Sequence, residues 1–312
     1  MPIIDQKLRY ENGKPNLIIA RVEKRIKDIK SEYNASYLDF CRLASKKFNV
    51  YYANKYLGQG VFKNGFKFHK NRFKEYPRKI FSKIIFNKRR LKANGGKDWQ
   101  VINKIRLYRI TFNKYCSYKI FKKYMKPTYR IKNRQDFNKK IKKIRTKKAV
   151  FKPMRGAGGV GIIIAPANSI AKKIKRFDGL LQEFINTSQG IIGLCHSIHD
   201  MRILIMNGKI IQTYIRMPKK GSLLSNIARG GSMKEIKKSK VPLIVKKIAF
   251  EIDKKYFKKF GPRIYSIDFG FENGRPYIFE MNSQPGLPFK AWRMYYNIWH
   301  KELLKTLLSA IK

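Results

Sequence analysis

Apolar runs of strand length, separated by short polar or glycine-containing stretches, recur along the first part of the chain. Asn16–Val22 and Asn49–Ala53 predict two buried strands, with a basic helical stretch between them. Val61–Phe68 carries Asn64-Gly65 at its centre and predicts a hairpin, because Asn-Gly suits the tight turn between antiparallel strands. Ile80–Phe86 predicts a further strand. Together these elements predict an N-terminal α/β lobe.

The rest of the chain continues the alternation of helices and strands. Asn113–Tyr124 predicts a helix, and Pro127 follows it, which fits because residues before a proline avoid helical geometry. Ser266–Phe271 and Tyr277–Met281 flank Asn273-Gly274 and predict a second hairpin. We predict three lobes in one α+β or α/β chain, over residues 1–112, 113–190 and 191–312.

The charge balance is the most unusual feature of the composition. The chain has 72 Lys and Arg against 19 Asp and Glu, which gives a formal net charge of +53. A charge of this size creates a positive field over the surface, which attracts nucleic acid, anionic membrane or acidic polymers in a salt-dependent way. A proteome that is basic throughout would give the same value. The charge alone therefore does not choose among these partners.

Several classes of protein are disfavoured by the sequence. No apolar run approaches the roughly 20 residues that cross a bilayer, and the first residues lack a secretory pattern. The three cysteines are far apart and fit neither a disulfide framework nor a zinc site, so we expect the reducing cytoplasm. His196 and His199 have no third ligand nearby, and we interpret them as loop or surface residues.

The second hairpin carries a candidate metal site. Glu280 and Asn282 project from the same face of one strand because strand side chains alternate, and Asp268 on the other strand can lie opposite them. Three hard oxygen donors of this kind suit magnesium. The alternative is a solvated hairpin with charged outer faces, but most neighbouring positions are apolar. On spacing alone we favour the metal site.

A glycine-rich loop, Arg155–Gly161, lies between two predicted strands and follows Lys152. Without side chains, its backbone amides can approach a phosphate closely. The loop lacks the Gly-Lys-Ser/Thr pattern of a P-loop, and it enters a strand rather than the helix of a dinucleotide fingerprint. By itself such a loop is a hairpin turn as often as a phosphate cover.

Single polar residues farther on have plausible but generic roles. Asp200 can hold ribose hydroxyls, and arginines such as Arg202 and Arg216 can bind phosphate or carboxylate through paired donors. One arginine among so many basic residues is in isolation best read as a surface charge. The order of these residues along the chain, taken together with the metal site and the glycine loop, is more specific than any one of them.

In chain order the pieces are Lys114, Lys152, the glycine loop, Gln182-Glu183-Phe184-Ile185, Asp200-Met-Arg202, Asn226 with Gly230-Gly231, Asp268, and Glu280-Met-Asn282. This order resembles the ATP-grasp superfamily over about residues 108–290. The tail Glu280–Leu287 (EMNSQPGL) and the segment Ser225–Gly231 (SNIARGG) look most like the RimK-type glutamate ligases. The endospore-coat-associated ATP-grasp proteins are an equally good match.

The resemblance implies a three-lobe enzyme that binds ATP between two α+β lobes, the central one acting as a lid. The residues that it assigns to ATP are Lys114, Lys152, Gly156, Gly158, Gly159, Gln182, Glu183, Phe184, Ile185 and Asp200. The lysines would hold phosphates under the glycine loop, the backbone of Glu183–Ile185 would read adenine, and Asp200 would contact the ribose side. By the same resemblance Asp268, Glu280 and Asn282 would hold one or two magnesium ions, or manganese.

The implied reaction joins a carboxylate to an amine. The carboxylate attacks the γ-phosphate of ATP, and the amine then displaces phosphate from the acylphosphate to form an amide. The resemblance places Arg216, Asn226 and Arg229 at the transferred group as catalytic residues. The positive charge favours an anionic acceptor such as an acidic peptide or polymer.

Two alternatives to the ligase stay open. One is an ATP-grasp scaffold that binds a polyanion or nucleic acid without ligase activity, and the other is a kinase-like enzyme that stops after phosphorylation. Similar enzymes are often dimers or tetramers, so a homo-oligomer is also left open. The segment Asn186–His199 is longer than in compact relatives. It leaves the ribose contact open and marks a candidate substrate-specific insertion.

Overall fold

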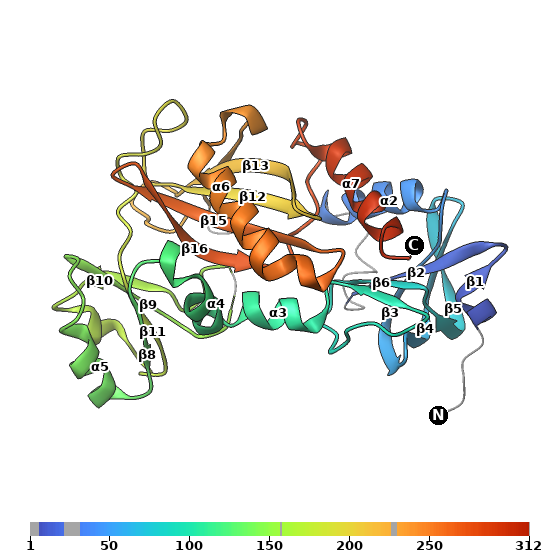
Figure 1. Cartoon of the computed structure of the whole chain (residues 1–312), viewed down its shortest axis with the longest axis horizontal. Coiled ribbons are helices and arrows are strands. Elements are labelled where there is room, and N and C mark those ends of the chain that lie inside the picture. The colour runs from blue at the N-terminus through green and yellow to red at the C-terminus, as the bar shows by residue number, and fades with distance from the viewer. Residues whose placement is uncertain (1–5, 22–31, 157, 226–229, 312) are drawn as a thin grey trace.

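Three β-sheets follow one another along the chain and define its architecture (Figure 1). The computed structural model describes residues 6–21, 32–156, 158–225 and 230–311. In Figure 1 the N-terminal sheet lies on the right, the central sheet on the lower left, and the C-terminal sheet above and between them. Each predicted lobe thus contains a sheet of its own, while the lobe limits near 112 and 190 stay a prediction.

The N-terminal sheet joins a parallel part to an antiparallel part. Its strands are β1 (Tyr10–Glu11), β2 (Lys14–Ala20), β3 (Asn49–Gly58), β4 (Val61–His69), β5 (Arg72–Phe81), β6 (Ile84–Asn87) and β7 (Gln100–Ile102). The spatial order is β5-β4-β3-β2-β6-β7, and β1 pairs with β2. Strands β2, β3, β6 and β7 run parallel, as alternating strands and helices predict, and β3-β4-β5 form an antiparallel meander.

The prediction of a hairpin at Asn64-Gly65 is wrong. Both residues lie inside β4, which pairs with β3 on one side and β5 on the other. Asn64 has the positive φ of 54° expected of this dipeptide, but here it forms an irregularity where the β4–β5 register shifts between Lys63 and Gly65. The chain actually turns at Gln59-Gly60 and at Lys70-Asn71, which are also at positive φ.

The single strand predicted over Ile80–Phe86 is divided between two elements. At the break, the Ser82 amide donates to Gly60 O at 2.9 Å, and the next amide, of Lys83, donates to Asn16 O at 2.9 Å. The chain therefore leaves its antiparallel partner, β4, and joins a parallel one, β2, within two residues. A continuous apolar run cannot reveal such a change of partner, because both strands are buried.

Helices connect and cover the sheets. They are α2 (Glu32–Ala44), α3 (Ile105–Phe112), α4 (Lys114–Phe121), α5 (Arg134–Ile141), α6 (Leu243–Ile252) and α7 (Tyr296–Leu308), with short 3-10 helices at Gln6–Arg9, Lys122–Tyr124, Ile170–Lys173, Lys238–Lys240 and Lys258–Phe260. Asn113 caps α4 by accepting from two backbone amides, which confirms the helix predicted there. Helix α3 was not predicted. No helix in the described ranges is long and apolar enough to span a membrane.

The central sheet is small and fully antiparallel. Its strands are β8 (Thr128–Ile131), β9 (Lys148–Lys152), β10 (Ile163–Pro166) and β11 (Gly179–Glu183), in the order β10-β9-β11-β8. Phe137 of α5 packs with Ile131, Phe151 and Leu181 to form its core. The glycine loop connects β9 to β10, so it projects from one end of the sheet.

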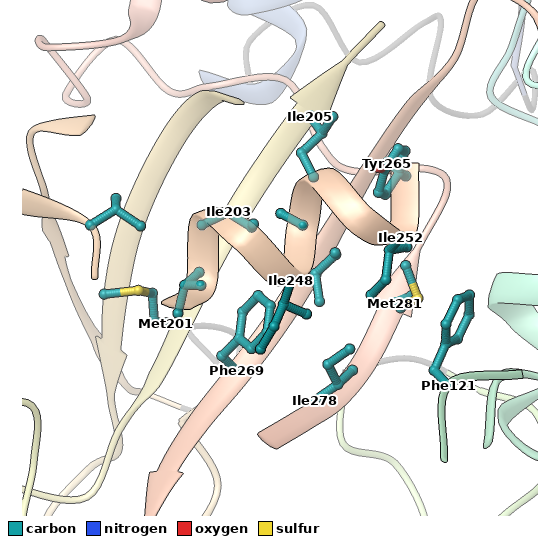
Figure 2. Packing of buried hydrophobic residues seen from close by; sticks show 14 of the residues in the cluster. Phe121, Met201, Ile203, Ile205, Ile248, Ile252, Tyr265, Phe269, Ile278 and Met281 are labelled. Carbon is teal, nitrogen blue, oxygen red and sulfur yellow. The ribbon is translucent and has the colours of Figure 1, made fainter. Parts of the chain in front are cut away.

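The C-terminal sheet contains the second predicted hairpin. Its strands are β12 (Asp200–Met206), β13 (Lys209–Met217), β14 (Ser232–Glu235), β15 (Ile264–Glu272) and β16 (Arg275–Asn282), in the order β14-β13-β12-β15-β16. The β15–β16 turn has Asn273 at φ 51° and Gly274 at φ 74°, which confirms the Asn-Gly hairpin. Figure 2 shows Ile248 and Ile252 of α6 packed on the sheet. A π-helical turn, Asp253–Phe257, extends α6.

The N-terminal and C-terminal sheets are joined through one buried amide. The Asn103 side chain donates to Ile264 O at 2.5 Å and to Ser283 O at 2.6 Å, and it accepts from the Ile264 amide at 2.8 Å. Gln284 also donates to Asn87 O at 3.1 Å. Helices α2 and α7 pack together in a core shared by both sheets. These contacts fix the N-terminal sheet against the end of β16.

Candidate functional site

A cleft open to solvent lies where the central and C-terminal sheets face each other. Predicted site residues in its lining are Gly159, Lys152, Gln182, Glu183, Phe184, Ile185, Asp200, Arg216, Asp268 and Glu280. Apolar side chains such as Val150, Ile164 and Phe279 line it as well. A concave, mostly apolar site with a few converging charged groups is typical of a small-ligand pocket.

Lys152 is the cation at the centre of this cleft. It is 5% exposed, and its ammonium donates to Gln182 Oε1 at 2.7 Å. The Gln182 amide in turn donates to Thr128 Oγ1 at 2.7 Å, so Gln182 positions the lysine. Burial, together with the nearby Lys114 ammonium, lowers the pKa of Lys152 to about 8, although Glu280 partly compensates. An anion placed here would gain from an under-compensated charge.

Lys114, at the start of α4, is a second lysine close to Glu280 and the glycine loop. Its ammonium donates to Gly156 O in the glycine loop at 2.7 Å and lies 3.7 Å from Glu280 Oε2. A smaller hollow next to the main cleft is lined by Lys114, Gly156, Glu280 and Asn282. Glu280 lines both cavities. The two lysines and the carboxylate thus bracket one region under the loop.

The glycine loop has the backbone conformation that only glycine adopts easily. Gly156, Gly158 and Gly159 have φ values of 134°, 69° and 74°. Of the three, Gly159 lines the main cleft and Gly156 the smaller one. Gly158 lines neither cavity.

The segment Glu183–Ile185 links the central sheet to the rest of the chain. The Glu183 carboxylate accepts from the Arg145 amide at 3.1 Å, and the Phe184 amide donates to Thr146 Oγ1 at 3.1 Å. The Glu183 side chain is therefore used to hold the loop before β9 and does not reach across the cleft. What this segment presents to the cleft is mainly the Phe184 and Ile185 side chains and its backbone.

Four charged side chains form a network on the floor of the cleft. Arg202 binds Asp268 through two hydrogen bonds of 2.5 Å, from Nε to Oδ1 and from an Nη to Oδ2. Arg216 bridges two carboxylates, donating to Asp200 Oδ1 at 2.6 Å and to Asp268 Oδ2 at 2.7 Å. The register explains the pairing, because Asp200 lies opposite Arg216, and Arg202 lies opposite Asp268.

The two carboxylates of this network differ in their proton affinity. Burial raises the pKa of Asp200 to about 7, and although Arg216 opposes this, the Asp268 charge adds to it. Burial also disfavours the charged form of Asp268, but the guanidinium groups of Arg202 and Arg216 outweigh that effect and lower its pKa. Asp268 is therefore the permanently ionised member.

The predicted metal ligands lie together at one edge of the network. Asp268 and Glu280 are directly paired across β15 and β16, and Asn282 is paired with Ser266 two positions along. The donor set of two carboxylates and one amide fits magnesium. Asp268 Oδ1 has only one hydrogen-bond donor in the network, which leaves it a free lone pair. Of the described residues, no three His, Cys, Asp or Glu side chains are grouped for a metal.

The segment that follows Glu183–Ile185 contributes Thr187 and His199 to the cleft lining. His199 is 1% exposed, with Nδ1 2.9 Å from Ser197 O and Nε2 accepting from the Phe271 amide at 3.3 Å. Thr187 accepts from the His199 amide at 3.2 Å, and both residues line the cleft. His199 therefore lies in a loop, as interpreted from the sequence, but it is buried and lines the cleft rather than lying at the surface. His196 is exposed.

Two predicted catalytic residues, Asn226 and Arg229, lie outside the described residues. The residues just before them, Leu223, Leu224 and Ser225, line the cleft. Sequence reasoning gave Arg202 only a generic anion-binding role and not its place in this network, although its spacing from Asp200 on one strand puts both on the same face. That spacing was the signal that could have identified it.

Comparison with known proteins shows the family of this chain. A family described as the RimK-like ATP-grasp domain matches residues 111–306, which is more than half of the chain. The chain belongs to the RimK-like ATP-grasp family. The match begins in α3 and ends in α7, so it contains the central sheet, the C-terminal sheet and the cleft between them.

Curated relatives match a little under half of the chain. A "Probable alpha-L-glutamate ligase" of Hydrogenovibrio crunogenus is 28% identical over 158 residues, covering 49% of this chain and 48% of that protein. One of the same name from Halorhodospira halophila is 31% identical over 144 residues, 44% of this chain and 43% of that protein. The chain spans about half the length of the curated relatives it matches.

Solved structures resemble nearly the whole chain. D-alanyl-alanine synthetase A from Vibrio cholerae aligns with a TM-score of 0.63 at 13% identity, covering 95% of this chain and 97% of that one. The RimK domain protein from Sphaerobacter thermophilus aligns with a TM-score of 0.58 at 9% identity, covering 94% and 99%. At such identities the likeness shows the fold, which is that of the ATP-grasp proteins. The N-terminal sheet is thus part of the shared fold.

Proposed function

We propose that this chain is an ATP- and magnesium-dependent ligase that joins a carboxylate to an amine through an acylphosphate. The observation that carries the proposal is the cleft that gathers Lys152, Asp268 and Glu280 between the central and C-terminal sheets. A polyanion-binding scaffold has no need of such a pocket. The names of the curated relatives and the ATP-grasp fold support the same reaction class.

The residues present suggest how ATP would be held. The phosphates would lie against Lys114 and Lys152 beneath the glycine loop, with adenine toward Phe184 and Ile185 in the apolar part of the cleft. Asp200 borders that part and is available to the ribose side. Lys152, with its position fixed by Gln182, would neutralise phosphate charge without having to reorient.

Magnesium would be held by Asp268, Glu280 and Asn282, where it would neutralise the phosphates during transfer. Arg202 and Arg216 fix the Asp268 carboxylate in its ionised state, so it is ready to bind a cation. Asn226 and Arg229 are proposed at the transferred group, next to the cleft-lining Ser225. Arg216 lines the cleft and can stabilise developing negative charge.

The proposed reaction has two balanced steps. A carboxylate oxygen of the substrate attacks the γ-phosphorus of ATP, and the bond to the bridging oxygen of ADP breaks. The nitrogen of the amine then attacks the acyl carbon, phosphate leaves, and the proton of the amine passes to phosphate or solvent. The protein contributes orientation and charge neutralisation rather than a nucleophile.

We further propose that an α-amino acid of the glutamate type supplies the amine and that the acceptor is an acidic peptide or polymer. The names of the curated relatives support the first point, and the net charge of +53 supports the second. A small neutral acceptor whose turnover is insensitive to salt would contradict the second point alone.

The direct test measures phosphate release from ATP and magnesium across amino acids, acidic peptides and cell-wall precursors, with mass spectrometry of the products. An amide product is expected. A stable phosphorylated product would instead indicate a kinase-like enzyme, and the absence of turnover on any substrate would favour the binding scaffold.

Glu280→Gln provides the matched variant for this assay. The Glu280 side chain is 27% exposed, so the change should leave folding intact while removing a charge from the metal site. We expect turnover to fall roughly a thousandfold or more, because phosphoryl transfer depends on neutralised charge. Unchanged turnover would exclude Glu280 as a metal ligand.

A further inference from the structure

Helix α6 buries one face and exposes an unusual set of apolar side chains on the other. Val245, Ile248 and Ile252 are buried against the C-terminal sheet, as Figure 2 shows for the two isoleucines. On the outer face Leu243 and Phe250 are 65% and 64% exposed. They are seven residues apart, which places them on one side of the helix.

A third apolar side chain, Ile244, adjoins this pair and is 47% exposed. The three residues belong to a single helix, whereas the other strongly exposed apolar side chains of the described chain are scattered over different elements. Scattered exposed apolar residues are normal, but a group on the outer surface of one helix marks an interaction site. We call Leu243, Ile244 and Phe250 the α6 apolar face.

Lysines surround the α6 apolar face on both sides. Residues 237–260 contain nine lysines and only two acids. Lys247 and Lys254 continue the spacing of Leu243 and Phe250 and are exposed. Of the two acids, Asp253 is buried in an ion pair with Arg263, and Glu251 lies 3.5 Å from Lys123. The surface around the apolar face is therefore positively charged without nearby compensation.

We propose that the α6 apolar face docks this protein on an anionic phospholipid membrane surface. A helix with large apolar side chains framed by lysines lies at the interface between headgroups and acyl chains, where the apolar residues enter and the lysines meet lipid phosphate. Each lysine near an anionic bilayer adds to the attraction. The protein would bind the surface without crossing it.

Two other occupants fit the same face less well. A second copy of the chain, docked by twofold symmetry, would bring Lys247 and Lys254 of each copy against the same lysines of the other. A nucleic acid would pair with the lysines but would leave Leu243 and Phe250 in contact with phosphates or water. Only a lipid surface uses both the apolar and the charged side chains.

The test is sedimentation of the full chain with vesicles of phosphatidylcholine alone or mixed with phosphatidylglycerol. We expect binding to the anionic vesicles that weakens with salt. The double substitution Leu243→Ser and Phe250→Ser should weaken it about tenfold or more, since two large side chains lose their lipid contact. Lys247→Gln with Lys254→Gln should weaken it by about tenfold as well.

Matched controls carry the same changes on other surfaces. Ile192→Ser alters a side chain that is 95% exposed on a different segment, and Lys142→Gln with Lys143→Gln removes two exposed charges beside α5. Neither should change vesicle binding by more than about twofold, because isolated surface contacts contribute little. All variants should keep the melting temperature of the parent, since every changed side chain is at the surface.

The proposal fails if anionic vesicles do not bind, or if the Leu243→Ser and Phe250→Ser protein binds them as tightly as the parent. In the latter case the net charge alone would account for binding. It also fails if the apolar substitutions reduce binding to single-stranded RNA as much as to vesicles, or if they convert a dimer to a monomer in sedimentation velocity. Those outcomes would assign the face to nucleic acid or to a second copy.

Discussion

The N-terminal and C-terminal sheets each contain the dipeptide Asn-Gly, and they use it in different ways. In the C-terminal sheet Asn273-Gly274 reverses the chain, so that Asp268 and Glu280 become cross-strand neighbours. In the N-terminal sheet Asn64-Gly65 lies within β4, and the strand continues on both sides. The asparagine φ is positive in both, 51° and 54°.

The difference shows that turn chemistry fixes a local conformation but not the path of the chain. After Asn64-Gly65 the apolar residues Phe66 and Phe68 continue to pack on the core shared with α2 and α7, so the strand is held. Around Asn273-Gly274 the two flanking strands bury their apolar residues against α6 together. Burial on both sides of the dipeptide decides which outcome forms.

The two sheets also differ in how they treat charge. The floor of the cleft buries Asp200, Arg202, Arg216 and Asp268 in mutual ion pairs. The N-terminal sheet instead places Lys55 opposite Lys63, and Lys63 opposite Lys79, on an exposed face. Water screens the exposed lysines, but the buried network depends on every member. Substitutions should therefore be far more costly in the C-terminal sheet.

The largest effect is expected for Asp268→Asn. The neutral amide cannot balance the charges of Arg202 and Arg216, so both guanidinium groups would remain buried without the negative charge of Asp268. We expect a loss of about 3–5 kcal/mol in the free energy of unfolding, together with loss of turnover. Urea denaturation gives the stability directly. Lys63→Gln is the matched control in the other sheet and should change stability by less than about 0.5 kcal/mol.

The next effect concerns a buried imidazole where α7 meets the N-terminal lobe. His300 is 4% exposed and lies 3.0 Å from Ser36 Oγ, and burial lowers its pKa to about 4. Unfolded His300 would take up a proton near pH 6.5, whereas the folded form resists it. Its contribution is therefore complete above pH 6.5 and is lost as the pH falls toward 4.

His300→Gln removes that dependence while keeping a partner for Ser36. Between pH 7 and pH 4 the parent should lose roughly 2–3 kcal/mol more stability than the variant. Chemical denaturation of both proteins across this range measures the difference. Parallel pH profiles would show that the imidazole is not responsible.

Gly65→Ala tests the close packing inside β4. A Cβ at Gly65 would lie 2.5 Å from the backbone oxygen of Tyr52 and 3.2 Å from the Ala53 Cβ. Because backbone rather than a flexible side chain blocks it, we expect a loss of about 2 kcal/mol. A shift in the denaturation midpoint without a change in turnover would confirm a purely structural effect.

Of these substitutions, Gly274→Ala should have the smallest effect on the free energy of unfolding. No atom lies within 4 Å of the added Cβ, so only the positive φ of 74° opposes the change. We expect a loss of about 1 kcal/mol. A larger loss than that of Gly65→Ala would reverse the ranking and show that the turn, rather than packing, controls the hairpin.

The sequence was sufficient to predict the parts of the fold in which a strand pairs with its neighbour in the chain. The β15–β16 hairpin and the shared face of Glu280 and Asn282 follow from alternation around one turn. The division between β5 and β6 does not, because the choice of partner strand depends on distant residues such as Asn16. Helix α3 was also missed, although most of its residues are apolar.

The candidate site was predictable in its order but not in its internal pairing. Asp268 and Glu280 were found from the spacing of the hairpin and Lys152 through the resemblance, and all three line one cleft. That Gln182 positions Lys152, or that Arg202 holds Asp268 bidentately, requires the strand register. His199 was missed because burial of a loop residue leaves no periodic pattern in the sequence.

The Asn103 amide gives the molecule a mechanical asymmetry. Its hydrogen bonds to the backbone oxygens of Ile264 and Ser283 hold the N-terminal sheet against the C-terminal one. Thr111 adds a hydrogen bond to Ser283 Oγ at 2.8 Å. The central sheet is attached more lightly, through contacts such as the ion pair of Lys126 with Glu272. The N-terminal and C-terminal sheets would then behave as one rigid frame. Ligand would then enter and leave the cleft through a hinge motion of the central sheet relative to this frame.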